Sequence, residues 1–231
     1  MPEPKILFFD IETAGVQALK SDLGFVILFG YKWNYEKESH VLAISREALR
    51  RFDDKELLIK ASKLLTEADL IVGHFASVFD RRFIQGRLLI NNLPPIPAVK
   101  MRDTCMIARS VANFSRNRLG HLARILHLKN EKHDSLWPAA WFQVMQGDMD
   151  TLVRMAKYCK GDVLAVEELY LRLRPFDNAH PRLNGDRSKC GVCGGNVEYR
   201  GVAYVNNNRY RRFVCKKCKH WGREANCVKD A

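Results

Sequence analysis

The chain has 231 residues, of which 47% are hydrophobic and 28% are charged, an ordinary globular composition with room for one catalytic domain and a small appendage. No apolar run approaches the roughly 20 residues that cross a bilayer, and the first residues, MPEPKILFFD, lack the pattern of a signal peptide. We therefore expect neither a membrane protein nor an exported protein, but a soluble, intracellular, cytoplasmic protein.

The formal net charge is +12 and is unevenly distributed. Residues 176–231 contain 12 Lys and Arg against 5 Asp and Glu, a surplus of seven, whereas residues 1–175 contain 26 against 21, a surplus of five. Because each neutralised phosphate releases counterions, such a basic excess favours nucleic acid as the partner. The alternative is that the charge serves only solubility.

The first third of the chain predicts three strands and a helix. Short apolar runs separated by polar turns are typical of an antiparallel meander. Ser45 is placed to cap a helix whose leucines recur on one face. The predicted strands are Ile6–Asp10, Phe25–Trp33 and Ser39–Ile44, and the predicted helix is Arg46–Ala68.

Strands and helices alternate after this point, which predicts an α/β domain with a mixed sheet flanked by helices. Asn91–Pro97 is a loop because its prolines fit neither a helix nor a central strand, and Asp148 is placed to cap the last helix. The predicted strands are Leu70–His74 and Val99–Thr104, and the helices are Phe79–Leu89, Arg118–Leu126, Trp137–Gln146 and Met149 to about Arg172. The expected organisation is a domain at 1–174, a linker at 175–188 and a small module at 189–231.

Four acids stand out in the first domain. Asp10 and Glu12 are two residues apart at the end of a predicted strand, so both point to one face and can share a cation, although a plain strand end is the alternative. Asp80 begins a helix, where an acid also serves to complement the helix dipole. Asp162 lies on the apolar stripe of a helix, where an acid is costly unless it is paired or binds a metal. Tyr158 precedes it by one turn on the same face.

The strings Asp10-Ile-Glu12-Thr13, Phe79-Asp80 and Tyr158-x-x-x-Asp162 resemble, in order and spacing, the three exonuclease motifs of the DEDD superfamily, in its tyrosine subclass. That superfamily includes the proofreading domains of DNA polymerases and many ribonucleases. The resemblance covers residues 5 to about 173 and implies a ribonuclease H-like fold with two divalent ions.

Four carboxylates without a histidine cluster suit two Mg²⁺ or Mn²⁺ ions, which together stabilise the attacking and leaving oxygens of a phosphodiester. By the resemblance, Asp10, Glu12 and Asp162 hold one ion, and Asp10 with Asp80 holds the other. Tyr158 would orient the attacking water rather than take its proton, because an ordinary tyrosine has a pKa of about 10.

Three further residues are carried over as contacts of the substrate's 3′ end. Thr13 and Ala14 follow the first motif, where the backbone in this superfamily meets the terminal 3′ hydroxyl. Phe75 is a departure, since the superfamily usually has Asn five residues before the Asp80 position. A phenylalanine there could stack on a base or pack in the core.

Two Cys-x-x-Cys pairs, Cys190/Cys193 and Cys215/Cys218, resemble the knuckles of a zinc ribbon. In a reducing compartment this duplicated spacing favours one structural Zn²⁺ over disulfides or redox chemistry. The 21 residues between the pairs fit a β-hairpin, and the metal would supply folding energy that so small a module lacks. Cys105 and Cys159 are expected in the core, and Cys227 has no assigned role.

Basic and aromatic residues alternate in and after this hairpin, among them Tyr210, Arg211 and Trp221, a pattern that suits a single strand of nucleic acid. Docking on another protein or a purely structural role is the alternative, and a membrane is not expected. The sequence thus predicts a two-metal 3′→5′ exonuclease of DNA, preferably single-stranded. An exoribonuclease is the enzymatic alternative, and an adaptor with a decayed catalytic centre is the alternative of another class.

Overall fold

The computed structural model describes residues 3–130, 139–183 and 185–224. The chain divides into two compact units, Lys5–Tyr170 and a smaller one formed by Leu171–Ala231 with Met1–Pro4. Cys227 and the start of the helix predicted from Trp137 lie outside the described residues.

A five-stranded sheet with the order β3-β2-β1-β4-β5 forms the centre of the larger unit. The pairs β1–β2 and β2–β3 are antiparallel, whereas β1–β4 and β4–β5 are parallel. The predicted meander and the predicted mixed sheet are therefore confirmed. The strands are β1 (Ile6–Gly15), β2 (Gly24–Trp33), β3 (His40–Ala43), β4 (Leu70–Gly73) and β5 (Lys100–Asp103).

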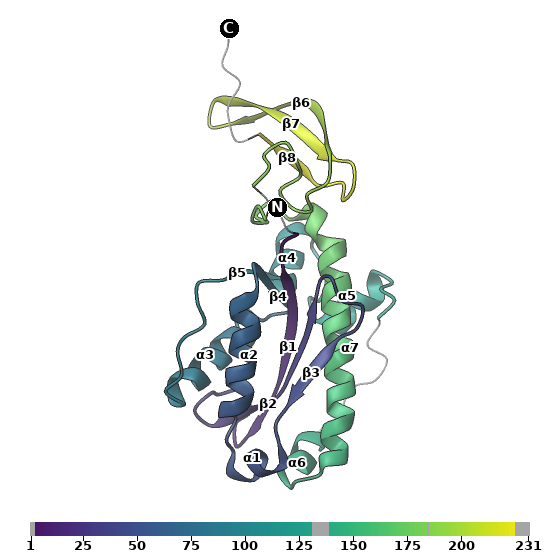
Figure 1. Cartoon of the computed structure of the whole chain (residues 1–231). Helices are drawn as coiled ribbons and strands as arrows, with labels where there is room; N and C mark the ends of the chain where they lie inside the picture. Colours follow the sequence, from purple (N-terminus) through teal and green to yellow (C-terminus); the bar gives the residue numbers. More distant parts are fainter. Residues whose placement is uncertain (1–2, 131–138, 184, 225–231) are drawn as a thin grey trace. The chain divides into compact units, whose positions relative to one another are not determined.

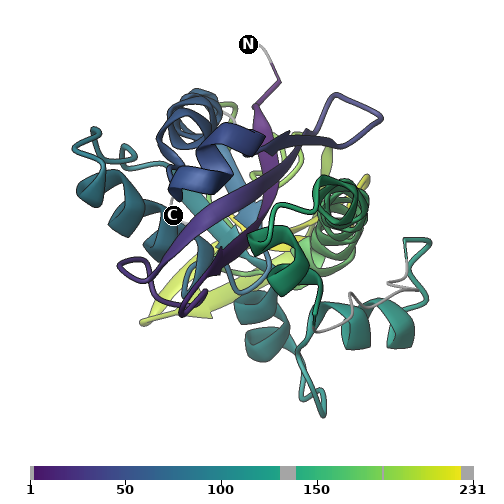
Figure 2. The ribbon, with the colours of Figure 1, turned by 90° about the horizontal axis from the view of Figure 1, so that it is seen from below.

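Helices cover both faces of this sheet: α2 and α3 lie on one side, and α7 runs along the other (Figures 1 and 2). Side chains of the sheet, α2, α3 and the N-terminal part of α7 form one buried cluster. The helices are α1 (Arg46–Arg51), α2 (Lys55–Glu67), α3 (Asp80–Ile90), α4 (Thr104–Val111), α5 (Leu119–Ile125), α6 (Ala140–Met145) and α7 (Met149–Leu173). No helix among the described residues is long and apolar enough to cross a membrane.

The single helix predicted from Arg46 to Ala68 is wrong, because the chain breaks between α1 and α2. Ser45 does cap α1, accepting a hydrogen bond from the Ala48 backbone N–H at 3.2 Å. Phe52 then adopts a left-handed conformation with φ of 54°, which ends α1. The helical periodicity continues across the break, so the sequence pattern does not reveal it.

Asp54, in this break, is fully buried and joins three elements. Its carboxylate accepts hydrogen bonds from the Val26 backbone N–H on β2 and from Nε and Nη2 of Arg87 on α3, each at 2.9 Å. A fourth donor, Asn91 Nδ2, lies at 3.1 Å. The chain breaks here because this carboxylate, rather than another helical turn, bridges the sheet and α3.

We expect Asp54→Asn to destabilise the protein by about 3–5 kcal/mol, because the neutral amide leaves the buried Arg87 charge without its partner. Urea unfolding measures the change. The control is Asp53→Asn, since Asp53 is exposed and accepts from the Lys55 backbone N–H. Equal stabilities of the two variants would show that the buried ion pair does not hold these elements together.

The smaller unit contains a three-stranded antiparallel sheet with the order β6-β7-β8. Its strands are β6 (Val197–Val205), β7 (Asn208–Cys215) and β8 (Trp221–Arg223), and a short 3₁₀ helix, η1 (Arg174–Phe176), precedes them. The hairpin predicted between the cysteine pairs is confirmed as β6–β7. The third strand was not predicted, because three residues give no periodicity to recognise.

Candidate metal centre

The acids of the first motif lie on a part of β1 that extends beyond its pairing with the parallel strand β4. β4 pairs with β1 only along Ile6–Phe8, whereas β2 pairs with β1 as far as Gly15. Asp10 and Glu12 are thus inside a strand, rather than at its end as predicted, and a bulge follows at Glu12/Thr13. The edge of β1 opposite β2 is open to other groups at this point.

A glycine lets α7 approach the strand at this level. Gly30 on β2 is paired with Asp10, and a Cβ added to Gly30 would lie 2.6 Å from Cys159 Sγ and 2.9 Å from Val163 Cγ2. The face of the sheet that carries Asp10 therefore packs directly on α7. Cys159 donates a long hydrogen bond from its thiol to Asp10 Oδ2, at 3.9 Å.

Three of the four predicted acids converge at this contact. Ligand oxygens of Asp10, Glu12 and Asp162 lie within 4.8 Å of one another. Asp162 is buried, and the two strand acids are half-buried. Carboxylates so close repel one another, and a hard divalent cation that prefers oxygen ligands offsets the repulsion. The donor set therefore fits Mg²⁺ or Mn²⁺.

The thiol of Cys159 stays neutral beside this cluster. Burial raises its pKa well above the usual value, and the negative charges of Asp10, Glu12 and Asp162 raise it further. A neutral thiol can donate to Asp10 without adding charge. The prediction that Cys159 and Cys105 are core residues is confirmed by their burial, but this contact of Cys159 was not predicted.

Asp80 approaches the same stretch of β1 from the start of α3. It is the first residue of α3, is buried, and accepts a hydrogen bond at Oδ1 from the Ile11 backbone N–H at 3.2 Å. Ile11 stands between the two strand acids, so Asp80 borders the cluster although it is outside the group of three. Burial raises the pKa of this carboxyl to about 7.

Asp80 should destabilise the folded protein as the pH rises. Its folded pKa exceeds the unfolded value, so the folded state binds more protons between about pH 4 and pH 7, and stability contributed by the neutral acid is lost across that range. With Mg²⁺ omitted, we expect Asp80→Asn to be more stable than the parent at pH 8, by roughly 1–4 kcal/mol, and close to it at pH 4. Urea unfolding at the two pH values measures this, and a difference that is independent of pH would contradict it.

Tyr158 lies on α7 one turn before Asp162, so the two residues share a helical face, as predicted. The side chain of Tyr158 is half-buried. The side chains of Thr13 and Ala14 are buried, and the Thr13 hydroxyl donates to the Ala18 carbonyl at 2.6 Å. A ligand could therefore meet these two residues through the backbone, as the resemblance implies, rather than through their side chains.

Phe75 is exposed, which rules out the core alternative. Its side chain is 39% accessible, its φ is 61°, and the Arg109 guanidinium carbon lies 5.9 Å from the ring centroid. A left-handed, exposed aromatic residue in the loop before Asp80 is a strained conformation that other contacts must hold.

Asp103 provides those contacts, and sequence reasoning missed it. It is buried and accepts from the backbone N–H groups of Phe75 and Ser77, both at 2.9 Å, and from the Ser77 hydroxyl at 2.6 Å. It also caps α4 by accepting from the Cys105 N–H at 2.9 Å. The signal was present, because an Asp between a predicted strand and a helix is a capping pattern.

The four predicted zinc ligands also converge. The sulfur atoms of Cys190 and Cys218 are 3.8 Å apart, and those of Cys193 and Cys215 are 3.5 Å apart. Four thiolates at about 2.3 Å around a tetrahedral Zn²⁺ would be about 3.8 Å apart, so the spacing is compatible with a zinc ribbon. The sulfur contacts shift the pKa values in opposite directions, since the hydrogen bond from Cys218 lowers the pKa of Cys190 to about 4 whereas burial raises the pKa of Cys193.

The two knuckles have the same turn. Gly194 and Lys219, each following the second cysteine of its pair, have φ of 70° and 66°. Each donates its N–H to the carbonyl of the first cysteine, at 2.9 and 3.0 Å. The turns therefore present their thiols in matching geometry, although the lysine has to adopt a conformation that glycine adopts more easily.

We expect Cys193→Ser to lose the metal and unfold the ribbon, because its buried apolar cluster holds only Cys190, Val192 and Cys215 among the described residues. Metal analysis of the purified parent should give one zinc per chain, and of the variant close to none. Cys105→Ser is the control, since it changes a cysteine outside this cluster. A variant that retains zinc would remove Cys193 from the ligand set.

The three predicted nucleic-acid contacts of the ribbon all lie on its sheet, but not on one face. Tyr210 and Arg211 are neighbours on β7, so they point to opposite faces. Trp221 on β8 is paired with Val214, which shares the face of Tyr210. Tyr210 and Trp221 therefore lie on one face of the sheet, and Arg211 lies on the other.

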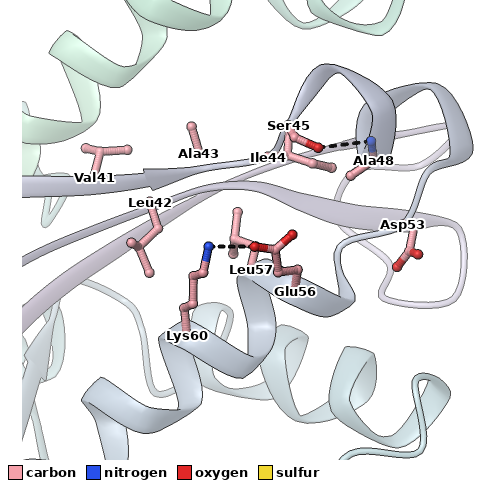
Figure 3. A pocket seen from close by; sticks show the side chains of 10 residues that line it. All are labelled: Val41, Leu42, Ala43, Ile44, Ser45, Ala48, Asp53, Glu56, Leu57 and Lys60. Atoms are coloured by element: carbon pink, nitrogen blue, oxygen red, sulfur yellow. Dashed lines mark hydrogen bonds and ion pairs between the residues drawn. The ribbon is translucent and has the colours of Figure 1, made fainter.

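A surface hollow of about 240 Å³ lies elsewhere, between β3, α1 and α2 (Figure 3). Its two acids are Asp53 and Glu56, and Glu56 is paired with Lys60 at 2.6 Å. None of the predicted site residues lines it. The converging carboxylates, rather than this hollow, define the candidate site.

Comparison with known proteins agrees with the fold. A family profile of the RNase H superfamily matches residues 7–174, and the chain belongs to that superfamily. A family B DNA polymerase from the hyperthermophilic archaeon Pyrobaculum calidifontis has the same fold, with a TM-score of 0.62 and 18% identity over 75% of this chain and 25% of the polymerase. The chain thus spans a quarter of the polymerase's length. No curated protein matches the chain in sequence. The profile match covers nearly all of the larger unit, which carries the candidate site.

Proposed function

We propose that the protein is a metal-dependent 3′→5′ exonuclease of the DEDD superfamily, tyrosine subclass, acting on DNA and preferably on single strands. The observation that carries the proposal is the convergence of Asp10, Glu12 and Asp162 within 4.8 Å, with Asp80 bonded to the strand between the first two. These are the acids whose order and spacing resemble that superfamily. Their intact cluster argues against an adaptor with a decayed centre.

The four acids would together hold two ions. Asp10, Glu12 and Asp162 would hold one, and Asp10 with Asp80, acting through a water, would hold the other. Bound there, two such cations would supply the activation of a water and the stabilisation of the leaving 3′ oxygen. Asp80 suits its place because a carboxyl with a pKa of about 7 exchanges its proton for a cation near neutral pH.

Two residues around the acids would position the reactants. The Tyr158 hydroxyl, one turn from Asp162, would orient the attacking water. Phe75, exposed in the loop held by Asp103, would stack on the terminal base. The Arg109 guanidinium beside that ring would lie near the adjoining phosphate. An aromatic platform replaces the usual amide in this arrangement, and it makes the terminal contact tolerant of base identity.

We expect a strand labelled at its 5′ end to give a descending ladder of products when Mg²⁺ or Mn²⁺ is present, because hydrolysis begins at the 3′ end. Matched DNA and RNA strands, single and duplex, should show single-stranded DNA cleaved fastest. Asp10→Ala and Asp162→Ala should abolish cleavage, since each removes a ligand of the ions. Tyr158→Phe should slow the reaction by about 10²–10⁴-fold without changing the metal requirement.

Glu47→Ala is a matched control, because Glu47 is an exposed acid on α1 outside the cluster. Internal cleavage, or a ladder that persists when magnesium and manganese are withheld, would contradict the proposed mechanism. Faster cleavage of RNA would favour the exoribonuclease, whose metal site is the same and whose recognition of the 2′ hydroxyl differs.

A further inference from the structure

One face of the ribbon sheet is turned away from the cysteine cluster. On β7, Phe213 and Cys215 are buried, whereas Arg212 between Phe213 and Arg211 is exposed and Val214 is only half-buried. Gly222 on β8 leaves room for the Phe213 ring, which a Cβ would meet at 2.5 Å. One face therefore packs toward the cysteines, and the opposite face does not.

We call that second face the open face, and it carries Tyr210, Arg212, Trp221 and Arg223. The strand register places them together, because Arg212 is paired with Arg223 and Val214 is paired with Trp221. The Arg212 guanidinium carbon lies 5.0 Å from the centroid of the Trp221 ring, and that of Arg223 lies 4.2 Å from the centroid of the Tyr210 ring. Each ring is thus in contact with an arginine from the neighbouring strand.

The arrangement places two positive charges directly opposite each other, which costs free energy in an antiparallel pair. On the other face, Arg211 has an acidic partner, because its guanidinium lies 3.8 Å from the carboxylate of Glu224. Glu198, which shares the open face beside Val214, is paired with Arg200 at 3.0 Å. An anion between Arg212 and Arg223 would offset their repulsion.

The chemistry of the four groups identifies the anion. A guanidinium matches a phosphate with two parallel N–H donors, and contact with a ring limits the conformational freedom that the side chain loses on binding. The rings of the half-buried Tyr210 and the exposed Trp221 offer surfaces on which bases stack regardless of sequence. Trp221 is 45% exposed, so its ring is available to a base.

From this juxtaposition we infer that the open face binds a single strand of nucleic acid, with phosphates at Arg212 and Arg223 and bases on Tyr210 and Trp221. Arg211, which the sequence pattern included, lies on the other face and is not part of the site. The inference deepens the proposed function, because it gives the enzyme a second hold on its substrate. It does not depend on the cleavage site being correct.

The test measures the binding of a fluorescein-labelled oligo-dT strand to the full chain carrying Asp10→Asn, by anisotropy over a range of KCl concentrations. Arg212→Gln with Arg223→Gln should weaken binding about tenfold and reduce the slope of log K against log salt by about 1.4, the value for two phosphate contacts on a single strand. The matched control is Arg209→Gln with Arg211→Gln, which removes the same charge from the opposite face. We expect that pair to change the slope much less.

Trp221→Ala should weaken binding about 5- to 150-fold, the range seen when one base loses its stacking partner, and Trp221→Phe should restore most of it. Zinc content close to one per chain confirms that each variant retains the ribbon. Equal effects of the two arginine pairs would overturn the inference, because they would show attraction to charge without a site. Unchanged binding in all ribbon variants would also overturn it and would favour docking on another protein.

The outcomes separate this inference from the proposed function. In the parent background, the open-face variants should raise the strand concentration needed for half-maximal cleavage, because they weaken the hold on the strand while the acids are untouched. Retained cleavage with unchanged strand binding would refute the open face alone. Strand binding that depends on the open face, together with no cleavage under any divalent metal, would refute the proposed exonuclease activity. The role of the open face in strand binding would still stand.

Discussion

Three carboxylates lie within 4.8 Å of one another where β1 meets α7, and their mutual repulsion is the constraint that the surrounding structure has to satisfy. Packing holds β1 and α7 together in spite of this repulsion. Gly30 allows Cys159 to lie against the sheet, and the rings of Phe8 and Tyr170 meet further along the same contact, with centroids 5.6 Å apart. A divalent cation bound there would convert the repulsion into coordination, which is why the close approach of these acids is informative about function.

The buried acids of this unit are of two kinds. Asp54 and Asp103 each accept four or more hydrogen bonds from the groups around them, so their charges are satisfied and they join elements of the fold. Asp80 has fewer donors, and burial raises its pKa to about 7. A buried acid with so few donors is a candidate for binding a ligand, whereas Asp54 and Asp103 are explained by the fold alone.

Local patterns predicted the sheet and the acid cluster, because strand alternation brings Asp10 to the same face as Glu12 and helical spacing brings Tyr158 to the face of Asp162. They did not predict the break after Phe52, whose cause is a carboxylate that bonds with distant Val26 and Arg87. The exposure of Phe75 likewise depends on Asp103, 28 residues away. The division of the ribbon residues between two faces follows from adjacency on β7, which became clear once the bounds of that strand were known.

The most direct test of the central claim is a crystal structure of the protein with Mn²⁺ and a short single strand of DNA, using anomalous scattering to locate the metal. The account predicts manganese about 2.1 Å from oxygens of Asp10, Glu12 and Asp162, with the 3′-terminal phosphodiester of the strand beside it. Manganese absent from these carboxylates, or a strand whose 3′ end lies away from them, would contradict the assignment of this cluster as the catalytic centre.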